Sequence, residues 1–304
     1  MAAPGYRRRH TGGDITGSSV KQTHSYIEHI INEAPGMQRG TVADDQRISR
    51  SSAGGGSVTR RRHCAANPQE SITMEQNNPL VTVIIPVYNG ERFLAAAIES
   101  VLSQLYCPLE LIVIDDGSTD GSGVIAKSYQ SLRYVFQPNG GLCAALNRGL
   151  EAAQGSFFAF LDADDLWMEN KLALQMSLFD KHPDVDIVFG HHQRFYNRDS
   201  GADQTRAAGA GTKILPAPFK GAMLIRRDSF FRVGLFDTTL RIGDFIDWYK
   251  RASEMKLRSF MPPDVVLKRR IHDDHLSNRD PHAAKDYVRI MKASLDRQRK
   301  KGPH

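Results

Sequence analysis

Short apolar runs and helical periods alternate along the chain from residue 80 onward. Four runs are rich in β-branched or aromatic residues and end in turn-forming residues, as buried strands do. They cover 81–86, 109–115, 132–136 and 157–161. The segments 91–104 and 141–153 between them carry apolar residues at helical spacing. This alternation predicts an α/β domain, with a mostly parallel central sheet flanked by helices.

Beyond the fourth run the pattern is less regular. It predicts strands over 185–189 and 222–226, and a long Gly/Ala/Asp-rich loop over 197–210. The segment 282–300 carries apolar residues at helical spacing among basic residues, which predicts an amphipathic helix. Such a helix either docks on the domain or lies on an anionic membrane surface, and we favour docking.

The N-terminal segment 1–73 has no such pattern. It is polar and glycine-rich, with too little apolar surface to offset the entropy of ordering, so we expect a disordered extension. Met74 stands shortly before the first strand, and one hypothesis is that translation naturally starts there. We therefore divide the chain into this extension, a central domain over 74–280 and a basic C-terminal helix within 281–304.

Composition narrows the class of protein. The chain has 304 residues and 3 Cys, too few and too far apart for a disulfide framework or a structural zinc site, which suits a reducing, cytoplasmic location. We find neither the roughly 20 consecutive apolar residues of a membrane span nor a signal peptide. The net charge is +6, but residues 1–73 hold 10 of the 40 basic and 6 of the 34 acidic side chains, leaving 30 against 28. We therefore expect no nucleic-acid partner.

Acidic side chains gather after the second and fourth runs. Asp115 and Asp116 end the second run, and Asp162, Asp164 and Asp165 follow the fourth. Ligands of open parallel sheets bind beyond the carboxyl ends of the strands, where crowded carboxylates repel one another unless they meet a cation or hydrogen-bond donors. An i, i+2 pair of carboxylates suits a hard cation, Mn²⁺ or Mg²⁺, that also holds a diphosphate. Alternatively, several of these residues are only turn and helix-cap residues.

Four segments, in this order and spacing, resemble glycosyltransferase family 2, whose members have the GT-A fold and use nucleotide sugars. They are V-T-V-I-I-P-V-Y-N-G-E (81–91), L-I-V-I-D-D-G-S-T-D-G-S (111–122), N-G-G-L-C-A-A-L-N-R-G-L (139–150) and F-L-D-A-D-D-L-W (160–167). The resemblance implies a nucleotide-sugar-binding half over 80–167 and an acceptor half over 168–280. The Q-x-x-R-W segment of processive synthases is absent from the sequence, so a non-processive enzyme is implied.

The resemblance also implies the donor site. Asp162 would lie near the ribose and could share the metal, Asp164 would bind the metal and the diphosphate, and the nucleobase would contact Pro86, Tyr88, Asn89 and Asp116. Tyr88 offers an aromatic face, and Asp116 can accept a hydrogen bond from a base N–H. Uridine is the commonest base in the family, and thymidine and guanosine stay open. The acceptor stays open among glycan, lipid-linked and peptide acceptors.

Inverting transfer needs a base that deprotonates the acceptor on the face opposite the diphosphate. The family places it in an acidic pair that opens a helix, which here corresponds to Gly243 and Asp244. Asp244 is the candidate, Asp247 one helical turn later is the alternative, and Asp244 could instead only cap the helix. A later R-x-H segment makes His272 a candidate near the metal or diphosphate, although it could equally be a surface-loop residue.

Two other functions compete with this interpretation. The segment 121–126 resembles a dinucleotide-binding fingerprint, but it does not follow the first strand and lacks the acidic residue expected about 20 positions later. The stronger alternative is a catalytically inactive glycosyltransferase-like protein that still binds nucleotide. The presence of the candidate carboxylates at 116, 162, 164 and 244 favours an active enzyme.

Overall fold

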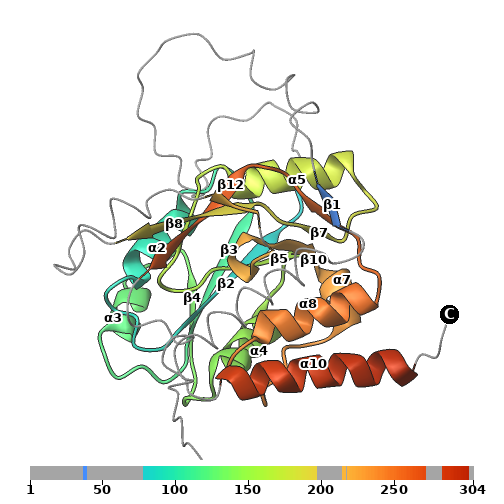
Figure 1. The fold of residues 1–304 in the computed structure, drawn as a ribbon. Coiled ribbons are helices and arrows are strands. Elements are labelled where there is room, and N and C mark those ends of the chain that lie inside the picture. Colours follow the sequence, from blue (N-terminus) through green and yellow to red (C-terminus); the bar gives the residue numbers. More distant parts are fainter. Residues whose placement is uncertain (1–36, 40–77, 197–213, 217, 272–282, 301–304) are drawn as a thin grey trace, which may run out of the picture.

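The computed structural model describes residues 37–39, 78–196, 214–216, 218–271 and 283–300 (Figure 1). The predicted α/β architecture is confirmed. The main sheet has eight strands in the order β1-β11-β7-β10-β5-β2-β3-β4, and only β10 runs antiparallel to its neighbours. These strands are β1 (Met37–Arg39), β2 (Val81–Val87), β3 (Leu109–Asp115), β4 (Arg133–Phe136), β5 (Phe157–Phe160), β7 (Ile187–Val188), β10 (Leu224–Arg226) and β11 (Ser259–Met261).

A smaller second sheet has the order β6-β12-β8-β9. Its strands are β6 (Leu166–Trp167), β8 (His191–Tyr196), β9 (Ile214–Leu215) and β12 (Val265–Ile271). The helices are α2 (Leu94–Leu102), α3 (Ser122–Lys127), α4 (Leu142–Ala152), α5 (Lys171–Lys181), the 3₁₀ helix η2 (Lys220–Ala222), α7 (Arg227–Val233), α8 (Asp244–Glu254) and α10 (Ala283–Lys300).

The first four predicted strands correspond to β2, β3, β4 and β5 to within one residue. The later predictions were less accurate: β7 covers two of the five residues predicted over 185–189, and β10 three of the five over 222–226. The predicted loop 197–210 lies outside the described residues. The sequence analysis did not anticipate the second sheet.

The extension 1–73, which we expected to be disordered throughout, is ordered at one place. Met37–Arg39 forms β1 and pairs in parallel with β11 at the edge of the main sheet, with Met37 packed against the core. The prediction is wrong for these three residues. An edge strand offers unpaired N–H and C=O groups to any extended segment, so such pairing needs no apolar pattern in the sequence. The other residues of the extension lie outside the described part.

The main sheet buries both of its faces. In β2, Val81, Val83 and Ile85 pack on the side of α2, whereas Ile84 packs on the side of α4. Because helices cover both faces, the central strands appear in the sequence as unbroken apolar runs rather than as an apolar–polar alternation.

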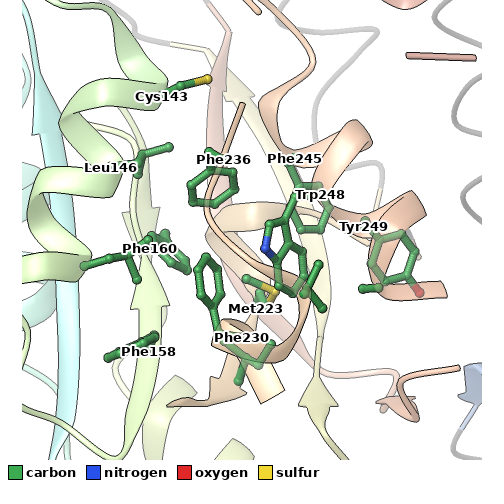
Figure 2. Close-up of a cluster of buried hydrophobic side chains, with 14 of the residues drawn as sticks. Cys143, Leu146, Phe158, Phe160, Met223, Phe230, Phe236, Phe245, Trp248 and Tyr249 are labelled. Carbon is green, nitrogen blue, oxygen red and sulfur yellow. The ribbon is translucent and has the colours of Figure 1, made fainter. Parts of the chain in front are cut away.

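An aromatic cluster joins the two halves of the domain (Figure 2). Phe158 and Phe160 of β5 contact Phe230 of α7, whose ring stacks on Trp248 of α8 with centroids 4.8 Å apart. Trp248 is fully buried, and its indole N–H donates to the carbonyl of Gly234 at 2.8 Å. This cluster fixes α8 relative to the central strands.

The C-terminal helix α10 packs on the outside of α8 (Figure 1), as the docking interpretation predicted. Tyr287 and Ile290 are buried against the core, and Ser294 and Arg297 donate to Glu254 at 2.6 Å each. Asp286 accepts hydrogen bonds from the backbone amides at 241 and 242, just before α8. Among the helices of the described ranges, none is both long enough and apolar enough to cross a membrane.

Replacing Trp248 by Ala should lower the free energy of unfolding by about 3–5 kcal/mol, because the change removes a fully buried indole and leaves a cavity. Urea unfolding followed by circular dichroism measures the difference. Phe136→Ala is the matched control, since Phe136 is 59% exposed and its loss should cost at most about 0.5 kcal/mol. Equal losses in the two variants would contradict the assignment of Trp248 to the core.

Candidate functional site

The loops that follow β2 and β3 are bound to each other at the carboxyl edge of the main sheet. Asn89 has a positive φ of 50°, and its side-chain oxygen accepts a hydrogen bond from the amide of Thr119 at 2.8 Å. The amide of Asn89 donates to the Ser118 hydroxyl at 3.0 Å. The predicted nucleotide-site residue Asn89 therefore also holds the two loops together.

Pro86 and Tyr88, also predicted to bind the nucleotide, differ in accessibility. Pro86 lies inside β2 and is buried, so its contribution is to the shape of the strand end. Tyr88 is 55% exposed. Its exposed ring is available for stacking on a planar ligand.

Asp116 is buried, and three donors surround its carboxylate. Gln137 Nε2 and the amides of Gly140 and Gly141 donate to it at 2.7–2.8 Å. Buried carboxylates need such donors, because an uncompensated charge away from water is costly. Asp116 thus fixes the loop between β4 and α4 beside the end of β3, a role that the sequence analysis did not assign to it.

The three aspartates after β5 have different environments. Asp162 keeps 36% of its side-chain surface exposed. Asp165 is buried and accepts a hydrogen bond from the amide of Arg270 at 2.8 Å. Burial, and then the charges of Asp164 and Asp162, raise the pKa of Asp165 well above its usual range, which favours its neutral form. Asp165 therefore supports the loop, and Asp162 and Asp164 remain as possible ligands.

Arg270 braces this acidic loop from the second sheet. Its Nε donates to the carbonyl of Asp164 at 2.8 Å, and its guanidinium lies over the rings of Phe93 and Phe195 at 4.4 and 4.6 Å. His272, predicted two residues further along, lies outside the described residues. Its proximity to Asp164 therefore stays a prediction.

A buried lysine, which the sequence analysis missed, connects this loop with α8. Lys220 Nζ lies 3.2 Å from Asp162 Oδ1 and 2.9 Å from Asp244 Oδ2. Burial by itself lowers the pKa of a lysine, but Asp162 and Asp244 outweigh this effect and raise the pKa of Lys220 above its ordinary value. The lysine therefore stays charged and brings the two predicted site carboxylates to one point.

Asp244 is the first residue of α8, as predicted, and the preceding Gly243 has a φ of 84°. A Cβ at this glycine would lie only 2.7 Å from Ile290 Cδ1 and 3.3 Å from Tyr287 Cε1 of α10. Both the left-handed backbone and the packing of α10 thus favour glycine at this position.

Asp247, the alternative base, belongs to a different group of side chains. Its Oδ2 accepts from Arg251 Nε at 2.8 Å, and its Oδ1 lies 3.9 Å from Arg297 of α10. Arg251 also donates to the carbonyls of Val233 and Leu235. This network ties α8 to the segment after α7, whereas Asp244 is the member of the pair that meets the Asp162 loop.

The predicted metal ligands in the described residues are two carboxylates, Asp162 and Asp164. No cluster of three or more His, Cys, Asp or Glu side chains suited to a metal occurs in the described ranges. Mg²⁺-type ions are commonly held by one or two carboxylates together with substrate phosphates rather than by a cage of protein ligands. The donor set present therefore fits a divalent ion that arrives with a diphosphate.

Comparison with known proteins identifies the family of the chain. The model of glycosyl transferase family 2 matches residues 82–241, more than half of the chain. An uncharacterized glycosyltransferase of Rickettsia typhi is 31% identical over 239 residues, which cover 73% of this chain and 74% of that protein. One of Rickettsia prowazekii is 30% identical over 239 residues, with the same coverage.

Solved structures share the fold. TarS of S. aureus (1–349), in complex with UDP-GlcNAc, aligns with a TM-score of 0.58 and 18% identity over 70% of this chain. The mannosyltransferase PcManGT of Pyrobaculum calidifontis, in complex with GDP-Man and Mn²⁺, aligns with a TM-score of 0.53 and 25% identity over 72% of this chain. The chain spans 65% and 64% of these two structures, respectively.

A largely parallel sheet with acidic loops at its carboxyl edge, and these structural neighbours, define a glycosyltransferase of the GT-A fold. The chain belongs to glycosyl transferase family 2.

Proposed function

We propose that this glycosyltransferase transfers a sugar from a nucleoside-diphosphate sugar, a UDP-sugar in the simplest case, to an acceptor hydroxyl with inversion at the anomeric carbon. The observation that carries the proposal is the junction at Lys220. There a carboxylate of the nucleotide-binding half, Asp162, and a carboxylate of the acceptor half, Asp244, lie on one ammonium group. A donor bound over Asp162 would therefore have Asp244 beside its reacting end.

The donor would be held at the carboxyl edge of the main sheet. Tyr88 would stack on the base, and Pro86, Asn89 and Asp116 would shape the pocket around it. Asp162 would accept from a ribose hydroxyl. The buried hydrogen bonds of Asp116 support a preformed base site, because they fix the surrounding loops without a ligand.

Asp162 and Asp164 would hold Mn²⁺ or Mg²⁺ together with the diphosphate. Such an ion, when bound, offsets the negative charge that develops on the leaving nucleoside diphosphate. PcManGT, which has a related fold, is in complex with GDP-Man and Mn²⁺, and this supports a divalent ion here. His272 would be a further contact on the same side.

Asp244 would act as the general base. It would take the proton of the acceptor hydroxyl while that oxygen bonds to the anomeric carbon and the bond from this carbon to the diphosphate oxygen breaks. Its Oδ2 contacts Lys220, and no residue in the described part forms a hydrogen bond with Oδ1. That second oxygen is therefore available to the acceptor. The competing hypothesis is an inactive protein that still binds nucleotide. The presence of both Asp162 and Asp244 argues against it.

The outer face of α10 supports a proposal about the acceptor and the location. Its exposed residues alternate basic and apolar along one stripe: Lys285, Val288, Lys292, Leu295 and Arg299. The cytoplasmic leaflet carries anionic lipids that attract such basic segments. We propose that the enzyme acts in the cytoplasm, peripherally at the inner face of the membrane. This location favours a lipid-linked acceptor over a free glycan or a peptide.

Nucleoside diphosphates should raise the melting temperature in a manganese-dependent manner, because a ligand of the native state adds about 2.7 kcal/mol of stability at 100 times its Kd. A thermal-shift panel of uridine, guanosine and thymidine diphosphates, with and without Mn²⁺, measures this effect. Asp164→Ala should keep the unliganded melting temperature and lose the metal dependence. Persistence of the full manganese effect in this variant would refute the metal assignment.

Asp244→Asn should lower turnover by about 10²–10⁴ with donor affinity nearly unchanged, since an amide cannot take the proton of the acceptor. Release of nucleoside diphosphate from sugar nucleotides, with water as the acceptor, provides the assay. Asp247→Asn is the comparison, and its effect should appear in stability through the lost contact with Arg251. A turnover loss confined to Asp247→Asn would transfer the base assignment to that residue.

Vesicles containing phosphatidylglycerol should bind the full chain, and vesicles of phosphatidylcholine alone should not. Charge reversal at Lys285, Lys292 and Arg299 should reduce binding at least tenfold in a cosedimentation assay, because each basic residue near an anionic surface contributes about 1 kcal/mol. The matched control reverses three exposed charges elsewhere, at positions 133, 148 and 181. Similar losses in both triple variants would rule out α10 as the specific contact.

A further inference from the structure

Lys220 is a buried cation shared by two partly exposed carboxylates. Its side chain is only 5% exposed, and its ammonium lies behind two carboxylates that keep surface of their own, 36% for Asp162 and 15% for Asp244. A ligand can therefore reach the carboxylates while the cation stays covered. The ammonium is placed to orient the two acids.

The second buried lysine of the described part, Lys171, shows that burial alone does not produce this arrangement. Lys171 Nζ donates to the Gln175 side chain and to the carbonyl of Met223, and it lies over the Trp167 ring. Among the described residues no carboxylate pairs with it, and burial lowers the pKa of Lys171 well below the ordinary range. Both lysines are thus buried, but two carboxylates raise the pKa of Lys220, whereas burial lowers the pKa of Lys171.

We propose that Lys220 is the positioning residue for the general base and for the donor-binding carboxylate, an inference that rests on the function proposed above. By holding Asp244 Oδ2 at 2.9 Å, the ammonium fixes the orientation of this side chain. The opposite oxygen of Asp244 then faces the acceptor. The same group holds Asp162 Oδ1 at 3.2 Å, which fixes the second acid.

This arrangement couples the two substrates through one side chain. Asp162 follows β5 in the nucleotide-binding half, Asp244 opens α8 in the acceptor half, and Lys220 lies on η2 between these segments in the chain. Two carboxylates this close to one point would repel each other without a cation between them. Loss of Lys220 should therefore disturb the base and the donor contact together.

A double-mutant cycle tests the proposal. Lys220→Met should lower the rate of nucleoside diphosphate release from UDP-GlcNAc and GDP-mannose at least 100-fold and should weaken nucleoside diphosphate binding. In the Asp244→Asn background, at saturating donor so that weaker binding does not contribute, the same change should lower the remaining rate no more than about threefold, because residues that act through one another are not additive. Lys171→Met is the matched control and should stay within about threefold of the unmodified protein.

Lys220→Arg, which keeps the charge, should retain more activity than Lys220→Met. If Lys220→Met does not fold by circular dichroism, Lys220→Gln replaces it in the cycle. The role of Lys220 would be overturned if the rate loss in the double variant equalled the product of the two single losses. It would also be overturned if Lys220→Met and Lys171→Met lowered the rate equally. Unchanged release by Asp244→Asn, or no release by the unmodified protein, would instead refute the proposed function on which this role depends.

Discussion

Uncompensated negative charge is the constraint on which this site depends. Acidic residues follow β3 and β5 and open α8; Asp116 and Asp165 are buried, and Asp162 and Asp244 are partly buried. The protein compensates each in a different way. Asp116 accepts hydrogen bonds from one side-chain N–H and two backbone amides. Burial raises the pKa of Asp165, which favours its neutral form. Asp162 and Asp244 both pair with the ammonium of Lys220. The differences in compensation separate the structural acids from those available to a ligand.

The sequence contained enough information for the nucleotide-binding half. Strands buried on both faces appear as apolar runs, and the acidic motifs lie at their ends, so β2, β3 and β5 and the positions of Asp116 and Asp162 could be predicted. The second sheet could not, because β12 contains the run Lys268, Arg269 and Arg270 and has no apolar pattern of a buried strand. The guanidinium groups of Arg269 and Arg270 lie over aromatic rings instead, which only the tertiary structure reveals.

Lys220 shows the same limit at the level of the site. A single lysine in a stretch without a motif gives no signal, since its partners come from loops distant in the sequence. The position of α8 likewise depends on tertiary packing. The aromatic cluster around Trp248 and the docking of α10 together hold Asp244 toward the acidic loop, whereas the side chain of Asp247, one turn later, faces Arg251.

Gly243 lies where the start of α8 meets the C-terminal helix α10. A Cβ at this position would lie 2.7 Å from Ile290 Cδ1 and 3.3 Å from Tyr287 Cε1 of α10. A side chain at 243 would therefore strain the left-handed backbone and press on α10 at the same time. The cost of a substitution here would be shared between two helices, so it would appear in the docking of α10 as well as in the geometry at the start of α8.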